Sequence, residues 1–217
     1  MCGIIGYSGP KEPLPILIGG LSRLEYRGYD SSGVAILDGE KLTIEKKEGK
    51  LQILKDHLEN SKINGNIGIG HTRWATHGVP NDVNAHPHSD NQKEFAIIHN
   101  GIIENYAEMK DDLLKEDFIF ESDTDTEVVA VELGNQWTGR LLETVTNVAK
   151  KLDGTYALVV TSTKEPGTIV AGRMMSPLVL GVGEGETFLA SDSAAILEHT
   201  NKMISVSYTH LTLPTKA

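Results

Sequence analysis

The sequence has a single cysteine among its 217 residues, which excludes an internal disulfide. No apolar run approaches the roughly 20 residues that span a bilayer. The first residues also lack the basic and then apolar pattern of a secretory signal. We therefore expect a cytoplasmic protein with no membrane partner.

Positive charge is scarce as well, since the formal net charge is -10. Binding to nucleic acid needs a basic surface, so we expect no nucleic-acid partner. The hydrophobic share of 39% and the charged share of 23% are ordinary for a soluble globular chain. The length suits one large domain, and no internal repeat or interdomain linker is visible.

Hydrophobic periodicity predicts strands near both ends of the chain and helices in the middle. Strands are expected at 2–7, 33–37, 41–48, 66–71, 94–99, 156–161, 168–171, 178–182 and 187–190. Helices are expected at 14–24, 51–58, 105–115, 125–137, 141–152 and, as a last short one, 191–198. Asp38-Gly39 predicts a hairpin turn, and Gly28 the end of the first helix. This order favours an α+β domain with mostly antiparallel sheet.

The last residues fit none of these patterns. In 205–217, Thr, Leu and Pro alternate without an amphipathic period, and 207–217 resembles vector- or adapter-encoded sequence. We expect one domain over 1–204, a non-native tail over 205–217, and a natural chain that was cut near Ile204.

Cys2 directly follows the initiator methionine. Once Met1 is removed, a thiol with a reference pKa of about 8.5 lies beside an α-amine of about 8. The amine can then accept the thiol proton, which gives an N-terminal nucleophile with its own base. The alternative is that Cys2 is a small apolar start to a strand, and taken alone this residue favours the alternative.

A polar loop is expected over 72–91, and loops of that length are often functional. Arg73 can hold a carboxylate with two parallel hydrogen bonds, and Thr76 can add a hydroxyl donor. Trp74 can cover a small substrate and exclude water. The alternative is a loop held by internal salt bridges, with Trp74 as packing.

Two further motifs offer complementary groups. Asn100 supplies a side-chain amide and Gly101 an unobstructed backbone N–H, as an oxyanion hole requires, although a bare Asn-Gly pair also suits a simple turn. Asp123, Thr124 or Asp125 can cap the helix that follows. An aspartate not used as a cap can pair with an ammonium group. Asp125 with Arg73 would then recognise an α-amino acid.

The histidines raise the question of a metal site, which the sequence does not favour. His86 and His88 flank Pro87, which stiffens the segment, and no H-E-x-x-H motif or cysteine cluster accompanies them. We expect no metal and no cofactor. These histidines, with His71, His77 and His99, are expected to form structural hydrogen bonds in an ordered loop.

Six motifs in order resemble the glutaminase domain of glucosamine-6-phosphate synthases, over residues 2–204. They are Cys2-Gly-Ile-Ile-Gly6, Leu24-Glu-Tyr-Arg-Gly-Tyr-Asp-Ser31, His71-Thr-Arg-Trp-Ala-Thr-His-Gly78, Asn84-Ala-His-Pro-His88, His99-Asn-Gly-Ile-Ile-Glu-Asn105 and Thr124-Asp-Thr-Glu127. The resemblance implies a four-layer αββα N-terminal-nucleophile hydrolase fold, with two antiparallel sheets between helices.

The resemblance also implies a reaction, the hydrolysis of L-glutamine to glutamate and ammonia through a glutamyl thioester. Cys2 would be the nucleophile, and Asn100 and Gly101 the oxyanion hole. Trp74 would belong to a loop that closes over glutamine. Arg27 would support the surroundings of the nucleophile.

For glutamine itself, the resemblance implies contacts at both ends of the amino acid. Arg73, Thr76 and the backbone of His77 would bind the carboxylate. Asp125 and the Gly101 carbonyl would bind the α-amine.

The sugar-isomerase domains of that family, which bind fructose 6-phosphate and receive the ammonia, are absent from this sequence. The full-length protein is expected to be a homo-oligomer. If Met1 is retained, we expect no activity. Two alternatives stay open: a glutaminase domain that serves purine or asparagine synthesis, and a non-catalytic glutamine-binding module.

Overall fold

The computed structural model describes residues 2–206 and 211–214. One sheet contains β1 (Gly3–Ser8), β2 (Ser31–Asp38), β3 (Lys41–Glu48), β4 (Ile67–Arg73), β9 (Val179–Val182), β10 (Thr187–Ala190) and β11 (Met203–Ser205). The other contains β5 (His88–Ser89), β6 (Phe95–Ile103), β7 (Gly154–Ser162), β8 (Thr168–Met174) and β12 (Leu211–Pro214). The strand orders are β11-β9-β10-β1-β4-β2-β3 and β12-β8-β7-β6-β5. All of these pairings are antiparallel.

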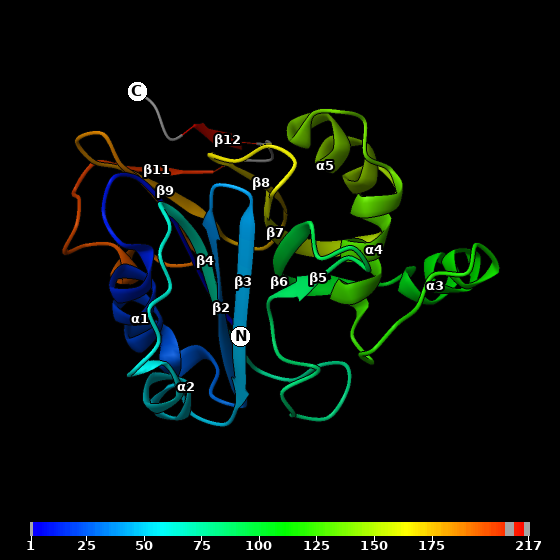
Figure 1. The fold of residues 1–217 in the computed structure, drawn as a ribbon, viewed down its shortest axis with the longest axis horizontal. Coiled ribbons are helices and arrows are strands. Elements are labelled where there is room, and N and C mark those ends of the chain that lie inside the picture. The colour runs from blue at the N-terminus through cyan, green and yellow to red at the C-terminus, as the bar shows by residue number, and fades with distance from the viewer. Residues whose placement is uncertain (1, 207–210, 215–217) are drawn as a thin grey trace.

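Helices cover the outer faces of the two sheets (Figure 1). α1 (Pro13–Leu24) and α2 (Leu51–Leu58) lie against the seven-stranded sheet, and α4 (Asp125–Asn135) and α5 (Leu141–Ala149) against the five-stranded one. α3 (Tyr106–Lys115) packs on α4. None of the helices in the described part of the chain has the length and apolar character that a bilayer crossing requires.

Three apolar cores separate these layers. In β1, Ile4 points into the core between the sheets and Ile5 into the core beneath α1, because successive strand side chains face opposite ways. A third core lies under α4 and α5 and includes Phe95 and Val145. The four-layer αββα arrangement expected from the resemblance is therefore confirmed.

Most predicted elements are confirmed with shifted ends. The helix over 51–58 and the strand over 187–190 have the predicted bounds. Asp38 pairs with Lys41 across Gly39 and Glu40, as the hairpin signal predicted. Gly28 closes a short 3₁₀ helix, η1 (Glu25–Arg27), rather than α1, and its backbone is extended at φ -175.

Some predictions were wrong. The helix expected over 191–198 is only one 3₁₀ turn, η2 (Ser193–Ala195), which Asp192 caps at its start. The turn does not continue as a helix, and Leu197, which an amphipathic helix would bury, is exposed. The loop expected over 72–91 is interrupted, since β4 runs on to Arg73 and β5 forms near its end. The strands β5, β11 and β12 were not predicted.

The predicted non-native tail lies partly outside the described residues. Ser205 ends β11, and β12 pairs with β8, with Leu211 opposite Ala171. The origin of 205–217 stays a prediction, as does the domain boundary at 204.

Candidate active site

Cys2 lies just before β1, a central strand of its sheet, and is half-buried. The Trp74 backbone N–H donates to Cys2 Sγ at 3.2 Å. Burial raises the pKa of the Cys2 thiol, while the Trp74 N–H and the charge of Arg73 act in the opposite direction. The sulfur is thus held against the start of the predicted polar loop, beside a cation.

Asn100 and Gly101 lie within β6, in the facing sheet. They pair with Ala157 and Tyr156 of β7, so the simple-turn alternative is wrong. The Asn100 amide Nδ2 donates to the Cys2 carbonyl at 3.0 Å. Gly101 has φ +132, and a Cβ there would lie 1.9 Å from the Thr155 oxygen, so only glycine fits. An amide donor and a glycine N–H are thereby fixed next to the cysteine.

Arg73 ends β4 and turns its guanidinium into the molecule. Its Nη2 donates to the carbonyls of His77 and, at 3.4 Å, Gly78. Its Nη1 is buried with no hydrogen-bond partner among the described residues, and no salt bridge there involves Arg73. The alternative of a loop held by internal salt bridges is therefore not supported around Arg73. Burial lowers the pKa of Arg73 from its ordinary value. A guanidinium stays charged in proteins.

The segment from Arg27 to Asp30 supports this loop from behind. Gly28 approaches so closely that a Cβ would lie 2.7 Å from the Arg73 carbonyl carbon. The Asp30 N–H donates to the Arg73 carbonyl at 3.0 Å, and Asp30 Oδ2 accepts from Ala75 at 2.8 Å. Arg27 pairs with Asp192 at 2.9 Å. Asp30 lies within a motif quoted above but was not predicted as a site residue, and no motif marked Asp192.

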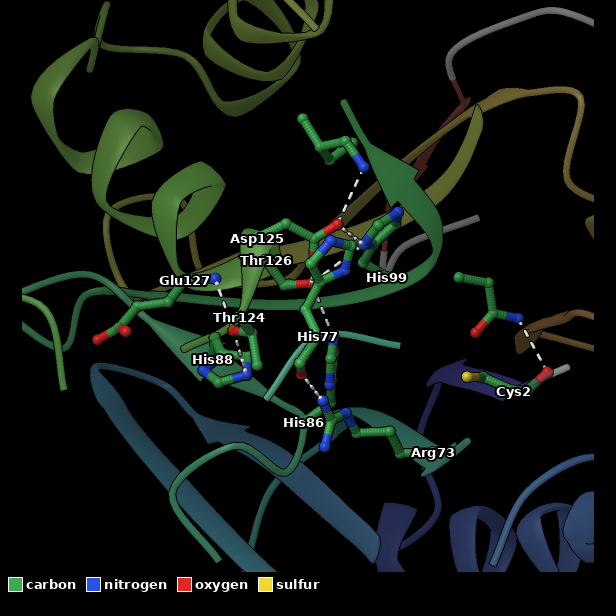
Figure 2. Close-up of polar contacts among 12 residues, drawn as sticks. Cys2, Arg73, His77, His86, His88, His99, Thr124, Asp125, Thr126 and Glu127 are labelled. Atoms are coloured by element: carbon green, nitrogen blue, oxygen red, sulfur yellow. Dashed lines mark hydrogen bonds and ion pairs between the residues drawn. The ribbon is translucent and has the colours of Figure 1, made fainter. Parts of the chain in front are cut away.

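The start of α4 settles which residue caps it. Thr124 accepts from the Glu127 N–H, so Asp125 is not the cap. Asp125 Oδ2 instead accepts from the Ile103 N–H at 2.9 Å and lies 3.9 Å from His99 Nδ1. Figure 2 shows Asp125 beside His99 and Thr126. Its carboxylate is buried and lines the same pocket as Cys2.

A cluster of buried histidines lies beside the pocket, and two of them, His86 and His99, line it. The cluster consists of His71, His86, His88 and His99. The rings of His71 and His86 stack with centroids 4.4 Å apart. Thr126 Oγ1 lies 2.9 Å from His86 Nε2 and 3.0 Å from His99 Nδ1 (Figure 2). Burial lowers the pKa of each of the four, that of His71 to about 3, so they are neutral. The predicted structural hydrogen bonds are confirmed for the buried histidines, although His71, His88 and His99 lie on strands rather than in a loop.

No group of three or more histidine, cysteine, aspartate or glutamate side chains is placed to hold a metal ion in residues 2–206. The neutral cluster instead forms hydrogen bonds to threonine hydroxyls and to Asn100.

One small pocket brings most of the predicted residues together. Its lining residues are Cys2, Arg73, Trp74, Thr76, His86, His99, Gly101, Thr124, Asp125 and Thr126. Its volume is about 20 Å³, enough for about one water molecule. Trp74 is 47% exposed and meets Tyr29 edge-on at 5.6 Å.

Three predicted site residues do not line this pocket. Asn100 reaches Cys2 from behind it. His77 turns its ring to Tyr106 at 5.1 Å and offers only its carbonyl, to Arg73. Arg27 lies behind the Arg73 backbone with Asp192. A larger cavity of about 910 Å³, between β3 and the segment after α3, contains none of the predicted site residues.

Comparisons with known proteins agree with this site. A family model described as a glutamine amidotransferase domain matches residues 55–214. The chain is 53% identical to a glutamine--fructose-6-phosphate aminotransferase (isomerizing) of Aquifex aeolicus, over 94% of this chain and 34% of that protein. It is 49% identical to the protein of that name from Fusobacterium nucleatum, over 100% of this chain and 36% of that protein. The chain thus spans about a third of the length of these relatives.

Solved structures show the same architecture. A glutamine phosphoribosylpyrophosphate amidotransferase from B. subtilis, complexed with ADP and GMP, has a TM-score of 0.81 and 26% identity, over 99% of this chain and 49% of that one. A glutamine aminotransferase class-II domain protein from Silicibacter pomeroyi has a TM-score of 0.59 at 14% identity, over 98% and 95% of the two chains, which shows the fold alone. With the family match across most of its length, this chain belongs to the glutamine amidotransferase domain family.

Proposed function

We propose that this chain releases ammonia from the side-chain amide of L-glutamine, with Cys2 as nucleophile and its own α-amine as base. The observation that carries the proposal is the bond from Asn100 Nδ2 to the Cys2 carbonyl at 3.0 Å. It supports the proposal because an oxyanion donor must lie beside the residue that carries the attacking thiol.

The proposed reaction has two halves. In the first, the α-amine takes the thiol proton and Sγ bonds to the amide carbon of glutamine. The oxygen then carries a negative charge, which Asn100 Nδ2 and the Gly101 N–H stabilise. The amine returns the proton to the leaving nitrogen, the C–N bond breaks, and ammonia leaves a glutamyl thioester. In the second, water attacks that carbon, the thiolate leaves and regains a proton, and glutamate is released.

Binding of glutamine uses its two charged ends. Arg73 Nη1, buried without a partner among the described residues, is the group that would complete a paired bond to the α-carboxylate, helped by Thr76 and the His77 backbone. Asp125, fixed by the Ile103 N–H, would hold the α-ammonium together with the Gly101 carbonyl. A buried carboxylate and a buried guanidinium in one pocket suit a zwitterionic amino acid.

Glutamine does not fit a cavity of about 20 Å³. We infer that the segment over 74–78 moves outward to admit it and then closes. Trp74 and Thr76 both line the pocket from this segment, and Trp74 is half-exposed. Arg27 would act indirectly, by holding η1 behind Arg73.

The full-length protein would pass the ammonia to fructose 6-phosphate in a region outside this chain. This part of the proposal rests on the relatives at about half identity, which carry the sugar-aminotransferase name, whereas the phosphoribosylpyrophosphate amidotransferase is 26% identical. We propose that this larger protein is a cytoplasmic homo-oligomer. A purine or asparagine role has less support, because the relatives at about half identity carry the sugar-aminotransferase name. A non-catalytic module has less support, because Cys2, Asn100 and Gly101 are all present in the sequence.

The test is glutamate release from L-glutamine by the purified chain with Met1 removed. Cys2→Ala should release none. A second variant inserts a lysine between Met1 and Cys2, which keeps the thiol but displaces the α-amine, and it should also be inactive while Cys2 still reacts with iodoacetamide. Equal rates in the parent and Cys2→Ala proteins would discard the nucleophile assignment, and full activity of the insertion variant would discard the base.

A further inference from the structure

His71 lies on β4 directly behind the proposed oxyanion donor. Its side chain is 0% exposed. Its Nε2 lies 2.9 Å from Asn100 Oδ1 and 3.0 Å from the His99 carbonyl oxygen. Both neighbours are carbonyl oxygens, which only accept hydrogen bonds, so Nε2 must carry the proton and donate to them. Burial lowers the pKa of His71 to about 3, so the ring is neutral and Nδ1 has no proton.

This donor determines which way the Asn100 amide faces. With Oδ1 held by His71, Nδ2 points to Cys2, where it donates to the carbonyl at 3.0 Å. The terminal torsion of an asparagine is broad and roughly two-fold, so without an anchor the oxygen and nitrogen can exchange places. An exchanged amide would present an oxygen, not a donor, to the forming oxyanion.

One ring nitrogen of His71 lowers the stability of the fold rather than adding to it. Nδ1 is buried and has no hydrogen-bond partner among the described residues. Such a group costs free energy that an apolar ring of similar size would avoid. The ring is held in place by stacking on His86 at 4.4 Å and by its position between strands, opposite Ile4 in β1 and Gly33 in β2.

We propose that His71 is a positioning residue of the oxyanion hole, whose Nε2–H fixes the Asn100 amide with its nitrogen toward Cys2. The inference rests on the proposed glutamine hydrolysis. His71 touches neither substrate nor thiol, and it acts only through Asn100.

The test uses three substitutions that differ in where they place a donor. His71→Gln puts an amide N–H near the position of Nε2, His71→Asn puts one near Nδ1, and His71→Phe has none. We expect His71→Phe and His71→Asn to lower kcat for glutamine about 10- to 100-fold with little change in KM. Without the Nε2–H the Asn100 amide can turn away, and the largest possible loss is that of the whole oxyanion donor. His71→Gln should remain within about three-fold of the parent, because it restores the donor.

Two further measurements separate positioning from a general loss of structure. Alkylation of Cys2 by iodoacetamide needs no oxyanion hole, so its rate should be unchanged in all three variants. In an Asn100→Ala background, His71→Asn should cause no further loss of kcat, because the group that it positions is gone. This comparison still decides the matter if His71→Phe does not fold.

Each outcome has a distinct meaning. The inference is overturned if His71→Phe or His71→Asn keeps the parent kcat, if His71→Gln falls as far as His71→Asn, if alkylation slows in step with turnover, or if the losses add in the Asn100→Ala background. If the parent itself releases no glutamate while Cys2 alkylates normally, the proposed function fails, and this inference with it.

Discussion

Asn100 donates from Nδ2 to the backbone carbonyl of Cys2 at 3.0 Å, so β6 of one sheet holds the residue that precedes β1 of the other. An amide nitrogen carries two hydrogens, and this bond uses one of them. The second makes no hydrogen bond to the described residues, so it would be free to meet an oxyanion formed at Cys2. The contact that anchors the nucleophile and the contact that would stabilise the reaction therefore come from the same side chain.

Asn100→Ala should lower kcat for glutamine about 10²- to 10³-fold, the usual cost of one oxyanion donor. KM should change little, since neither charged end of glutamine meets this side chain. Steady-state glutamate release measures both constants. An Asn100→Ala protein with the kcat of the parent contradicts the assignment.

Arg73→Lys should raise KM for glutamine about ten-fold or more, because a lysine ammonium cannot reproduce the paired bonds of a guanidinium. The control substrate is 4-aminobutanamide, which is glutamine without its carboxylate. Its low rate of hydrolysis should be the same in the parent and in Arg73→Lys. An unchanged KM for glutamine removes Arg73 from the carboxylate role.

Asp125→Asn tests the opposite end of the substrate. The amide oxygen can still accept from the Ile103 N–H, so the fold should persist. Loss of the negative charge should raise KM for glutamine by about 100-fold or more, because breaking a buried charge pair costs about 3 to 5 kcal/mol. Glutaramic acid, which lacks the α-amine, should not distinguish the variant from the parent. Equal KM values for glutamine would show that Asp125 does not bind the ammonium.

The buried histidines predict a loss of stability in mild acid. Burial lowers their pKa in the folded protein, so between about pH 6.5 and the folded value the unfolded chain binds more protons. Stability is then complete above about pH 6.5 and falls as the pH falls, by up to about 1.4 kcal/mol per pH unit for each histidine.

Urea unfolding between pH 7.5 and pH 5.0 measures this effect, because most carboxylates stay ionised there. The control is His57→Gln, since His57 is an exposed histidine that pairs with Glu45 and should contribute little. A midpoint that does not move over this range is incompatible with the neutral buried cluster.

Gly101→Ala should destabilise the fold by about 2 kcal/mol or more, because φ is +132 and the added carbon meets the Thr155 oxygen. Gly39→Ala is the matched control, with φ +56 and open space around it, and should cost only about 1 kcal/mol. Thermal unfolding of the two variants checks the difference. Equal losses of stability in the two variants would mean that the backbone around Gly101 shifts easily to admit the added carbon.

Sequence patterns predicted the elements that depend on local chemistry. α1 was visible because Leu17, Leu21 and Leu24 share one helix face and pack on the sheet. The hairpin after Asp38 was predicted from the Asp38-Gly39 pair, because the turn needs a positive φ, which Gly39 adopts. The edge strands β5 and β11 could not be predicted from the sequence, because each has only two or three residues and depends on a partner strand.

The residues of the candidate site also fall into a group that the sequence predicted and a group that it did not. Cys2, Arg73, Gly101 and Asp125 were identified from residue type and motif order, and the pocket brings them together. The roles of Asp30 and His71 depend on contacts across strands and between sheets, such as the bond from Ala75 to Asp30. Such contacts have no spacing along the chain that a pattern can detect.

The position of β1 between β4 and β10 has a consequence for biosynthesis. Ile5 pairs with both Gly70 and Ala190, so this strand cannot be completed until a late part of the chain has left the ribosome. At about 5 to 20 residues per second, that interval lasts on the order of ten to forty seconds. During it, β1 has no β10 to pair with. The late arrival of β10 thus provides the time in which the leading methionine can be removed, before the sheet closes around its neighbours.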